Sequence, residues 1–210
     1  MTETEPGRLI VLAAPSGAGK TTLVHELLSR EPELEFSISY TTRPKRPNET
    51  HAEDYFFVTK EEFDAMRDSD AFLEYAEVFD NWYGTSDEYV QSRIDEGHSI
   101  LLEIDWQGAQ QIRERRDDAL TVFIMPPSRE ELERRLRGRQ TDSEEVIQRR
   151  LRDALSDMGH WGEFGFVVIN DNLDAAAAQL AAIVNGRGEV SRTDNPALSA
   201  RVGEILSAEE

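Results

Sequence analysis

Short apolar runs recur along the chain, and segments with a helical pattern of apolar and polar residues separate them. Four of these runs, at residues 9–14, 100–104, 120–125 and 166–170, are apolar almost throughout and have the length of a strand. Such strands are typical of a parallel sheet that is covered on both faces. Because strands alternate with helices, the pattern predicts an α/β fold with a mostly parallel sheet in a three-layer core.

Capping signals mark where the helices begin and end. Thr59 and Glu62 have the spacing of a capping box, and Ser128 and Glu131 repeat it. Gly97 is well suited to end a helix. The sequence predicts helices over residues 20–30, 59–67, 86–96, 107–116, 128–137, 143–158, 173–184 and 196–206, with a loose linker over 186–197.

The stretch 36–85 departs from this alternation. It contains short strand patterns at 36–41, 55–58 and 72–79, with a loop over 42–54 and a turn around 80–84. We interpret it as a lobe with antiparallel pairing, inserted between the first and second core strands. The helical pair at 128–158 is interpreted as a second, smaller insertion.

The segment that follows the first apolar run reads A-A-P-S-G-A-G-K-T-T, over residues 13–22. A strand, a Gly-rich turn, Lys-Thr and a helix form the arrangement of a phosphate-binding P-loop. In such a loop, backbone N–H groups at a helix N-terminus bind the phosphates. Lys20 is expected to reach the β- and γ-phosphates, and Thr21 to bind Mg²⁺. The strict pattern has glycine where this chain has Ala14.

Composition excludes several classes of site and partner. The 210 residues include no cysteine, so disulfides and thiolate metal sites are excluded. The formal net charge is −19, which disfavours nucleic acid polymers and anionic membranes as partners. The polar N-terminus predicts a cytoplasmic protein. Adaptation to high salt is a further hypothesis for the acidic surface.

Residues downstream of the loop indicate what a second phosphate-bearing ligand would be. Arg43 and Arg46 follow a strand pattern, and two guanidiniums can hold a phosphate dianion. Glu74 lies in a later strand pattern, and an ionised glutamate only accepts hydrogen bonds. It therefore suits the adjacent N1–H and 2-amino donors of guanine and does not suit adenine.

Seven segments follow one another in the order and spacing of one protein family: A-P-S-G-A-G-K-T, S-Y-T-T-R-P-K-R-P, D-Y-F-F-V, F-L-E-Y-A-E-V-F, W-Y-G-T, I-D-W-Q-G-A and R-L-R-G-R. With them the chain resembles the guanylate kinases, and most of all the bacterial enzymes, over about residues 8–184. The resemblance implies ATP-dependent phosphorylation of GMP, and of dGMP, in purine nucleotide metabolism and GMP recycling, with Mg²⁺ as cofactor. It leaves open whether K⁺ is required and whether the protein is a monomer or a homodimer.

The resemblance also implies a division of the chain and a set of site residues. The core comprises 1–36, 86–127 and 159–185, the GMP-binding lobe 37–85, the lid 128–158 and the C-terminal tail 186–210. ATP binding is implied for Ala14, Pro15, Ser16, Gly17, Ala18, Gly19, Lys20, Thr21, Thr22 and Asn170. GMP binding is implied for Ser39, Arg43, Arg46, Tyr55, Glu74, Tyr83, Thr85, Glu103 and Asp105. The implied catalytic residues are Lys20, Arg43 and the lid residues Arg135, Arg139 and Arg150, and the implied metal ligands are Thr21 and Asp105.

Other lid arginines have a simpler interpretation. Arg129, Arg134, Arg137 and Arg152 are expected in ion pairs on a solvated helix face.

Two other functions remain open on the sequence alone. A related P-loop kinase could phosphorylate a ribose bisphosphate, although such a sugar has no guanine edge for Glu74 to bind. A guanylate-kinase-like module could bind a protein without catalysis, but such modules typically lack a working P-loop. The presence of Lys20, Thr21 and the lid arginines favours an enzyme.

Overall fold

The computed structural model describes residues 6–138 and 143–207. It divides into two compact units, one formed by residues up to 11 together with 33–119, and the other by 12–32 together with 120 onward. Strand β1 (Leu9–Ala13) contributes residues to both units. The larger sheet has the strand order β2-β7-β1-β8-β9. The predicted α/β class with a mostly parallel sheet is confirmed.

In the first unit, β2 (Leu34–Phe36) pairs in parallel with β7 (Ser99–Ile104), and Leu34 lies opposite Ser99. The helices α3 (Asp87–Asp95) and α4 (Trp106–Arg115) precede and follow β7. The central residues of β7 and the inward residues of both helices are buried, namely Ile100, Leu101, Leu102, Val90, Ile94, Ala109 and Ile112. Burial of these apolar side chains is the main force that holds the elements together.

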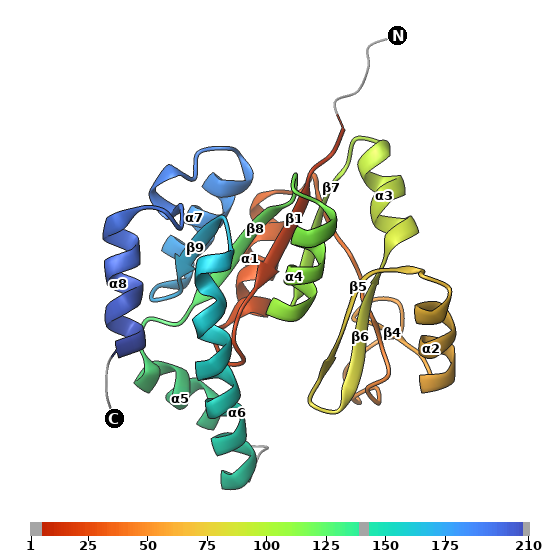
Figure 1. Ribbon diagram of the computed structural model, residues 1–210, viewed down its shortest axis with the longest axis horizontal. Helices are drawn as coiled ribbons and strands as arrows, with labels where there is room; N and C mark the ends of the chain where they lie inside the picture. Colours follow the sequence, from red (N-terminus) through yellow and green to blue (C-terminus); the bar gives the residue numbers. More distant parts are fainter. Residues whose placement is uncertain (1–5, 139–142, 208–210) are drawn as a thin grey trace. The chain divides into compact units, whose positions relative to one another are not determined.

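The same unit contains a small sheet with the order β4-β3-β6-β5. Its long strands β5 (Phe72–Val78) and β6 (Asn81–Ser86) form an antiparallel hairpin, which Figure 1 shows at its full length. Shorter strands β3 (Tyr40–Thr41) and β4 (Phe56–Phe57) extend the sheet, and α2 (Lys60–Asp68) lies between β4 and β5 in the chain. The ring of Phe63 on α2 stacks on Phe72, with centroids 4.6 Å apart.

Three details of this lobe differ from the expectations. The expected strand over 36–41 is divided, because Phe36 belongs to the larger sheet whereas Tyr40 belongs to the smaller one. The pair β3–β4 is parallel, not antiparallel. The turn of the hairpin lies at Phe79 and Asp80, both with positive φ, so Asn81 and Gly84 belong to β6.

In the second unit, β8 (Leu120–Met125) pairs in parallel with β9 (Phe166–Ile169). Helix α1 (Lys20–Arg30) contacts α7 (Leu173–Val184), and Arg30 pairs with Asp174 at 2.5 Å. Helices α5 (Arg129–Arg137) and α6 (Glu144–Met158) contact each other, and the 3₁₀ turn η1 (Gly159–Glu163) follows them. The helix boundaries predicted by capping signals are confirmed to within two residues.

The C-terminal residues pack into this unit, so the expectation of a loose linker over 186–197 is wrong. A 3₁₀ turn η2 (Glu189–Ser191) leads to a bridge between Phe166 and Arg192, and Thr193 N–H donates to the Gly165 carbonyl at 3.1 Å. The predicted terminal helix is present as α8 (Pro196–Ser207), with its Val202 and Ile205 buried. Hydrogen bonds to the backbone next to β9 fix the path of this segment.

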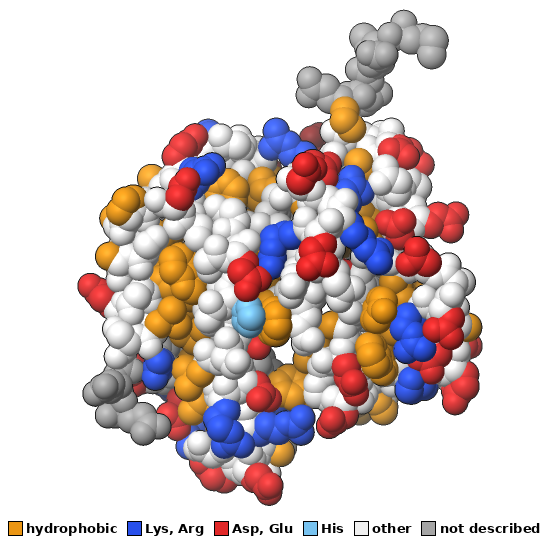
Figure 2. Space-filling model, viewed as in Figure 1, with side chains coloured by type: hydrophobic (Ala, Val, Ile, Leu, Met, Phe, Trp, Pro, Cys, Tyr) orange, Lys and Arg blue, Asp and Glu red, His pale blue; other side chains and the backbone are white. Residues whose placement is uncertain are grey.

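Charged side chains of both signs cover the surface. On the face that Figure 2 shows, acidic side chains lie scattered with basic side chains among them. Many are neighbours on one helix, such as Lys60 and Asp64 at 2.8 Å. Exposed pairs of this kind contribute little to stability, on the order of 0–1 kcal/mol each. None of the helices in the described part of the chain is long and apolar enough to cross a membrane.

Gly203→Ala is expected to stabilise the protein by about 0.5–1 kcal/mol, because the interior of a helix favours alanine over glycine. Gly203 lies within α8, and a Cβ built on it meets no atom within 4 Å. The free energy of unfolding in urea measures the effect. An unchanged value would show that α8 does not fold with the rest of its unit.

Candidate functional sites

Residues 14–19 form a tight turn between β1 and α1 in the second unit. Gly17 and Gly19 have φ of 90° and 88°, which favours glycine at both positions. Ala18 N–H donates to the Pro15 carbonyl at 3.2 Å, which closes the turn. The turn opens directly into α1 at Lys20, so Lys20 and Thr21 lie at a helix N-terminus. This arrangement is that of an anion-binding loop, which we call the phosphate loop.

Helix α5 supports the phosphate loop through apolar contacts at Gly17. A Cβ on Gly17 would lie 3.0 Å from Leu132 Cδ1 and 3.0 Å from Leu136 Cδ2. Both leucines are buried, at 0% and 1% exposure. The loop and α5 are therefore packed together with no room for a larger residue at position 17.

Polar contacts hold the phosphate loop at Ala18. Asn170 Nδ2 donates to the Ala18 carbonyl at 2.7 Å, and Arg135 Nη1 donates to the same oxygen at 3.1 Å. Arg135 Nη2 also donates to the backbone carbonyl of Asn170 at 3.0 Å. Arg135 and Asn170, which lie far apart in the sequence, thus meet at one peptide group of the loop.

Glu131 orients the Arg135 side chain, and the sequence did not mark Glu131 as functional. Its Oε1 accepts from Arg135 Nε at 2.7 Å, and its Oε2 accepts from Arg134 Nε at 2.7 Å. The hydrogen bonds from Arg134 and then Arg135 lower the pKa of Glu131 to about 2. The carboxylate therefore stays charged at neutral pH and keeps its hold on Arg135.

The other arginines of residues 128–158 have several roles. Arg134 and Arg137 form the expected ion pairs, the latter with Glu133 and Glu144. For Arg129 that expectation is wrong, because Arg129 Nη2 donates to the Leu206 carbonyl in the last turn of α8. Arg150 lies half-buried on α6, and the predicted residue Arg139 lies outside the described residues.

In the first unit, Glu74 and Thr85 lie opposite each other on β5 and β6. Both are buried, at 3% and 0% exposure, and Thr85 Oγ1 donates to Glu74 Oε1 at 2.5 Å. Tyr40 pairs with Gly84, next to Thr85 on β6, and Ser39 directly precedes Tyr40 in the chain. Two of the three residues predicted to contact guanine, Glu74 and Thr85, are thus paired in one sheet.

The N-terminus of α4 lies against Glu74. A Cβ on Gly108 would be 2.3 Å from Glu74 Oε2, so only glycine fits at that position. Asp105 caps the same helix, since its Oδ1 accepts from Gly108 N–H at 2.8 Å. The first turn of α4, at the positive end of its helix dipole, thus lies close to the Glu74 carboxylate. Gly108 is a second residue that the sequence did not mark, although it lies in the I-D-W-Q-G-A segment.

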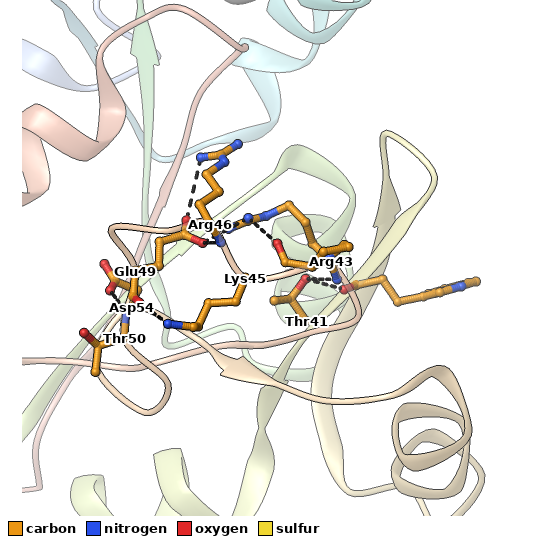
Figure 3. Close-up of polar contacts among 9 residues, drawn as sticks. Thr41, Arg43, Lys45, Arg46, Glu49, Thr50 and Asp54 are labelled. Atoms are coloured by element: carbon orange, nitrogen blue, oxygen red, sulfur yellow. Dashed lines mark hydrogen bonds and ion pairs between the residues drawn. The ribbon is translucent and has the colours of Figure 1, made fainter.

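Arg43, Arg46 and Glu49 form an arginine–glutamate cluster in the loop after β3 (Figure 3). Glu49 accepts from Arg43 Nη2 at 2.7 Å and from Arg43 Nη1 at 3.1 Å. It also accepts from Arg46 N–H at 2.7 Å, and its Oε1 is 3.7 Å from Arg46 Nη1. The hydrogen bond from Arg43 is the main cause of the lowered pKa of Glu49. Glu49 thus fixes both arginines that the sequence predicted to bind a phosphate.

Tyr55 and Tyr83 complete this side of the first unit. The Tyr55 and Tyr83 rings meet edge to face at 5.9 Å, and Arg43 Cζ lies 5.4 Å from the centre of the Tyr55 ring. Burial, followed by the charge of Glu103, raises the pKa of Tyr55 to about 12. Tyr55 therefore keeps its O–H at neutral pH and can donate to an anion beside Arg43.

The predicted site residues are divided between the two units. The first unit holds the residues predicted for GMP, and the second holds the phosphate loop, Asn170, Arg135 and Arg150. Glu49, Gly108 and Glu131 are additions from the structure. An acidic residue close after two arginines was the available signal for Glu49, and a glycine early in a helix was the signal for Gly108.

Comparison with known proteins gives one consistent family. Residues 6–187 match the family model described as guanylate kinase. The guanylate kinase of Aromatoleum aromaticum is 55% identical over 179 residues, which cover 85% of this chain and 88% of that protein. The guanylate kinase of Methylococcus capsulatus is 48% identical over 95% of this chain and 98% of that protein. The crystal structure of guanylate kinase from Anaplasma phagocytophilum matches with a TM-score of 0.73 and 30% identity, over 98% of both chains.

Proposed function

The chain belongs to the guanylate kinase family, and on that premise we propose that it transfers the γ-phosphoryl group of ATP to GMP or dGMP. An oxygen of the acceptor's phosphate attacks the γ-phosphorus in line. The bond from the γ-phosphorus to the β,γ-bridging oxygen breaks, and ADP leaves with that oxygen. The products are ADP and GDP, or dGDP from dGMP. In this reaction the protein acts mainly by positioning the substrates and by neutralising the charge on the moving group.

The observation that carries the proposal is the buried Glu74 carboxylate with Thr85 and Gly108 around it. An ionised glutamate can accept from guanine N1–H and from the 2-amino group together. Adenine presents no such pair of donors on that edge, so with AMP the buried carboxylate would lose the two hydrogen bonds that guanine donates. Ser39, which directly precedes β3, would supply a further hydroxyl for the base.

The arginine–glutamate cluster supports a role in holding the acceptor's phosphate. Glu49 bonds the Nη1–Nη2 end of the Arg43 guanidinium. The guanidinium has another edge, formed by Nε and Nη2, which can bind two phosphate oxygens at the same time. Burial acts to lower the pKa of Arg43, but its bonds with Glu49 and Tyr83 outweigh that effect and raise it. Arg46, Tyr55 and Tyr83 add donors for the same phosphate.

The phosphate loop supports ATP as the donor. Residues Ala14 to Thr22, with the exception of Pro15, supply its backbone N–H groups, and Lys20 would contact the β- and γ-phosphates. Arg150, and Arg139 outside the described residues, would neutralise the transferred group. Arg135 contacts the loop itself, because its Nη1 donates to the Ala18 carbonyl.

The donor groups present fit Mg²⁺. This ion prefers oxygen ligands and is commonly held by one or two protein groups together with substrate phosphates. The Thr21 hydroxyl in the second unit and the Asp105 carboxylate in the first unit are each an oxygen ligand of that kind, and Asp105 is already fixed as the cap of α4. Bound Mg²⁺ would neutralise charge on the phosphates during transfer.

An assay of ADP release with ATP, Mg²⁺ and a series of acceptors tests the function. We expect rapid turnover with GMP and dGMP, and little with AMP or a ribose bisphosphate, at both low and high salt. Turnover of the sugar phosphate alone would support the related kinase instead. Binding of GMP without any ADP release would support a non-catalytic module.

Glu49→Gln is expected to raise the KM for GMP about tenfold, because the loss of one charge-assisted bond frees Arg43 and Arg46. The KM for ATP should stay unchanged, since Glu49 contacts only residues of its own loop. Steady-state kinetics with each substrate varied in turn measures both constants. The control is Glu53→Gln, an exposed residue in the same loop. Equal KM changes for the two substrates would contradict the assignment.

A further inference from the structure

Two side chains, those of Asn170 and Arg135, donate hydrogen bonds to the Ala18 carbonyl. Both bonds are made to the loop backbone, and neither depends on a nucleotide base. We propose that Asn170 and Arg135 are positioning residues that hold the Ala18–Gly19 peptide so that its N–H points at the donor's phosphates. This role differs from the direct contact with ATP that the resemblance implied for Asn170. The proposal rests on the proposed function only for the identity of the donor as ATP.

The geometry of the peptide group carries the first step. A trans peptide is planar, and its C=O and N–H point in opposite directions. The Ala18 oxygen points at Asn170 Nδ2 and Arg135 Nη1, at 2.7 and 3.1 Å. The Gly19 N–H must therefore point away from these two side chains. In a phosphate loop, that N–H is one of the groups that bind the anion.

The charge of Arg135 adds a second effect. A carbonyl that accepts two hydrogen bonds, one of them from a cation, is polarised, and its own N–H becomes a better donor. Asn170 is 5% exposed, so its bond to Ala18 is shielded from water. Arg135 is in turn held at Nε by Glu131 and at Nη2 by the Asn170 carbonyl. The two residues thus form a rigid support for one peptide group.

The close packing at Gly19 supports the same reading. A Cβ on Gly19 would be 2.6 Å from Asn170 Nδ2 and 3.8 Å from Arg135 Nη1. The side chains therefore lie directly against the loop backbone. Asn170 extends from the end of β9, and Arg135 from α5, whose leucines also pack on Gly17. The loop is fixed by elements of its own unit.

The test measures the binding of Mg²⁺–tripolyphosphate, a ligand with phosphates and no base, by calorimetry. The variants are Asn170→Ala and Asn170→Asp, and the matched control is Asn185→Ala on the exposed end of α7. Both Asn170 variants are expected to weaken the binding of tripolyphosphate and of ATP to the same extent, with each Kd raised by about tenfold or more. Asn170→Asp keeps the shape of the side chain but replaces the donor with an acceptor that faces the Ala18 carbonyl. The loss of affinity should therefore be greater with Asn170→Asp than with Asn170→Ala.

The outcomes separate the alternatives. A normal Kd for tripolyphosphate with a weakened Kd for ATP would show an adenine contact and overturn the proposal. Equal loss for both ligands in the variants, with a normal Asn185→Ala control, supports it. Arg135→Lys keeps the positive charge but lacks the several fixed donors of the guanidinium. The same equal loss of affinity for tripolyphosphate and ATP is expected with this variant. This variant keeps the test valid if the Asn170 variants do not fold. Binding is measured without GMP, so failure of the proposed kinase activity would not alter the result.

Discussion

Glu74→Gln is expected to lower kcat/KM for GMP by about 10³-fold, because a buried amide places a donor against a donor of guanine. The Kd for ATP should stay near its normal value, since Glu74 and its contacts Thr85 and Gly108 all lie in the first unit. Steady-state kinetics with GMP and a separate ATP titration measure the two effects. Glu77→Gln, an exposed residue on the same strand, is the control.

Gly108→Ala tests the same carboxylate without changing it. Its Cβ would overlap Glu74 Oε2, at 2.3 Å, and so would displace the carboxylate from its place beside Thr85. Selective loss with GMP is therefore expected again. Gly203→Ala is the helical control with open space around it. If GMP turnover survives both Glu74→Gln and Gly108→Ala, then Glu74 does not bind the base.

Gly19→Ala is expected to weaken ATP binding by about 10²-fold. One cause is the positive φ of 88°, which costs a non-glycine residue on the order of 1–2 kcal/mol. The other is the overlap of the new Cβ with Asn170 Nδ2, at 2.6 Å. Movement of the loop to relieve both would spoil its grip on the phosphates. Equilibrium binding of ATP with Mg²⁺ measures the loss.

Gly186→Ala is the matched control for this variant. Gly186 has φ of 71°, but a Cβ there meets no atom within 4 Å. Its alanine variant should lose a similar amount of stability to backbone strain while it binds ATP normally. If both variants bind ATP equally well, then the contact between Gly19 and Asn170 has no role in the donor site.

The sequence predicted most elements because their signals are local. Thr59 and Glu62 form the expected capping box, and Ser128 caps α5 as expected. The chain between Phe36 and Tyr40 was misjudged because its alternation is the same whether it continues one sheet or passes to another. The parallel pairing of β4 was missed for the same reason, since side-chain alternation carries no strand direction.

The site was predicted in its parts, but its supporting contacts were not. The motifs predicted Arg43 and Arg135 as site residues. No motif, however, relates Arg135 to the Ala18 carbonyl, 117 residues away in the chain. The tight fit of Gly108 against Glu74 depends on how α4 packs on β5. Contacts of this kind follow from tertiary packing, which local patterns do not encode.

The division of the chain into two units has a consequence for how acceptor preference could change. Every group that we assign to the acceptor nucleotide comes from one uninterrupted stretch, 33–119, whereas the phosphate loop and its supports come from 12–32 and from 120 onward. The residues that determine which acceptor is used therefore lie in a single continuous stretch of the chain. Recombination at two points could exchange that stretch whole, and the phosphate loop with its supports would pass unaltered to an enzyme for a different nucleotide.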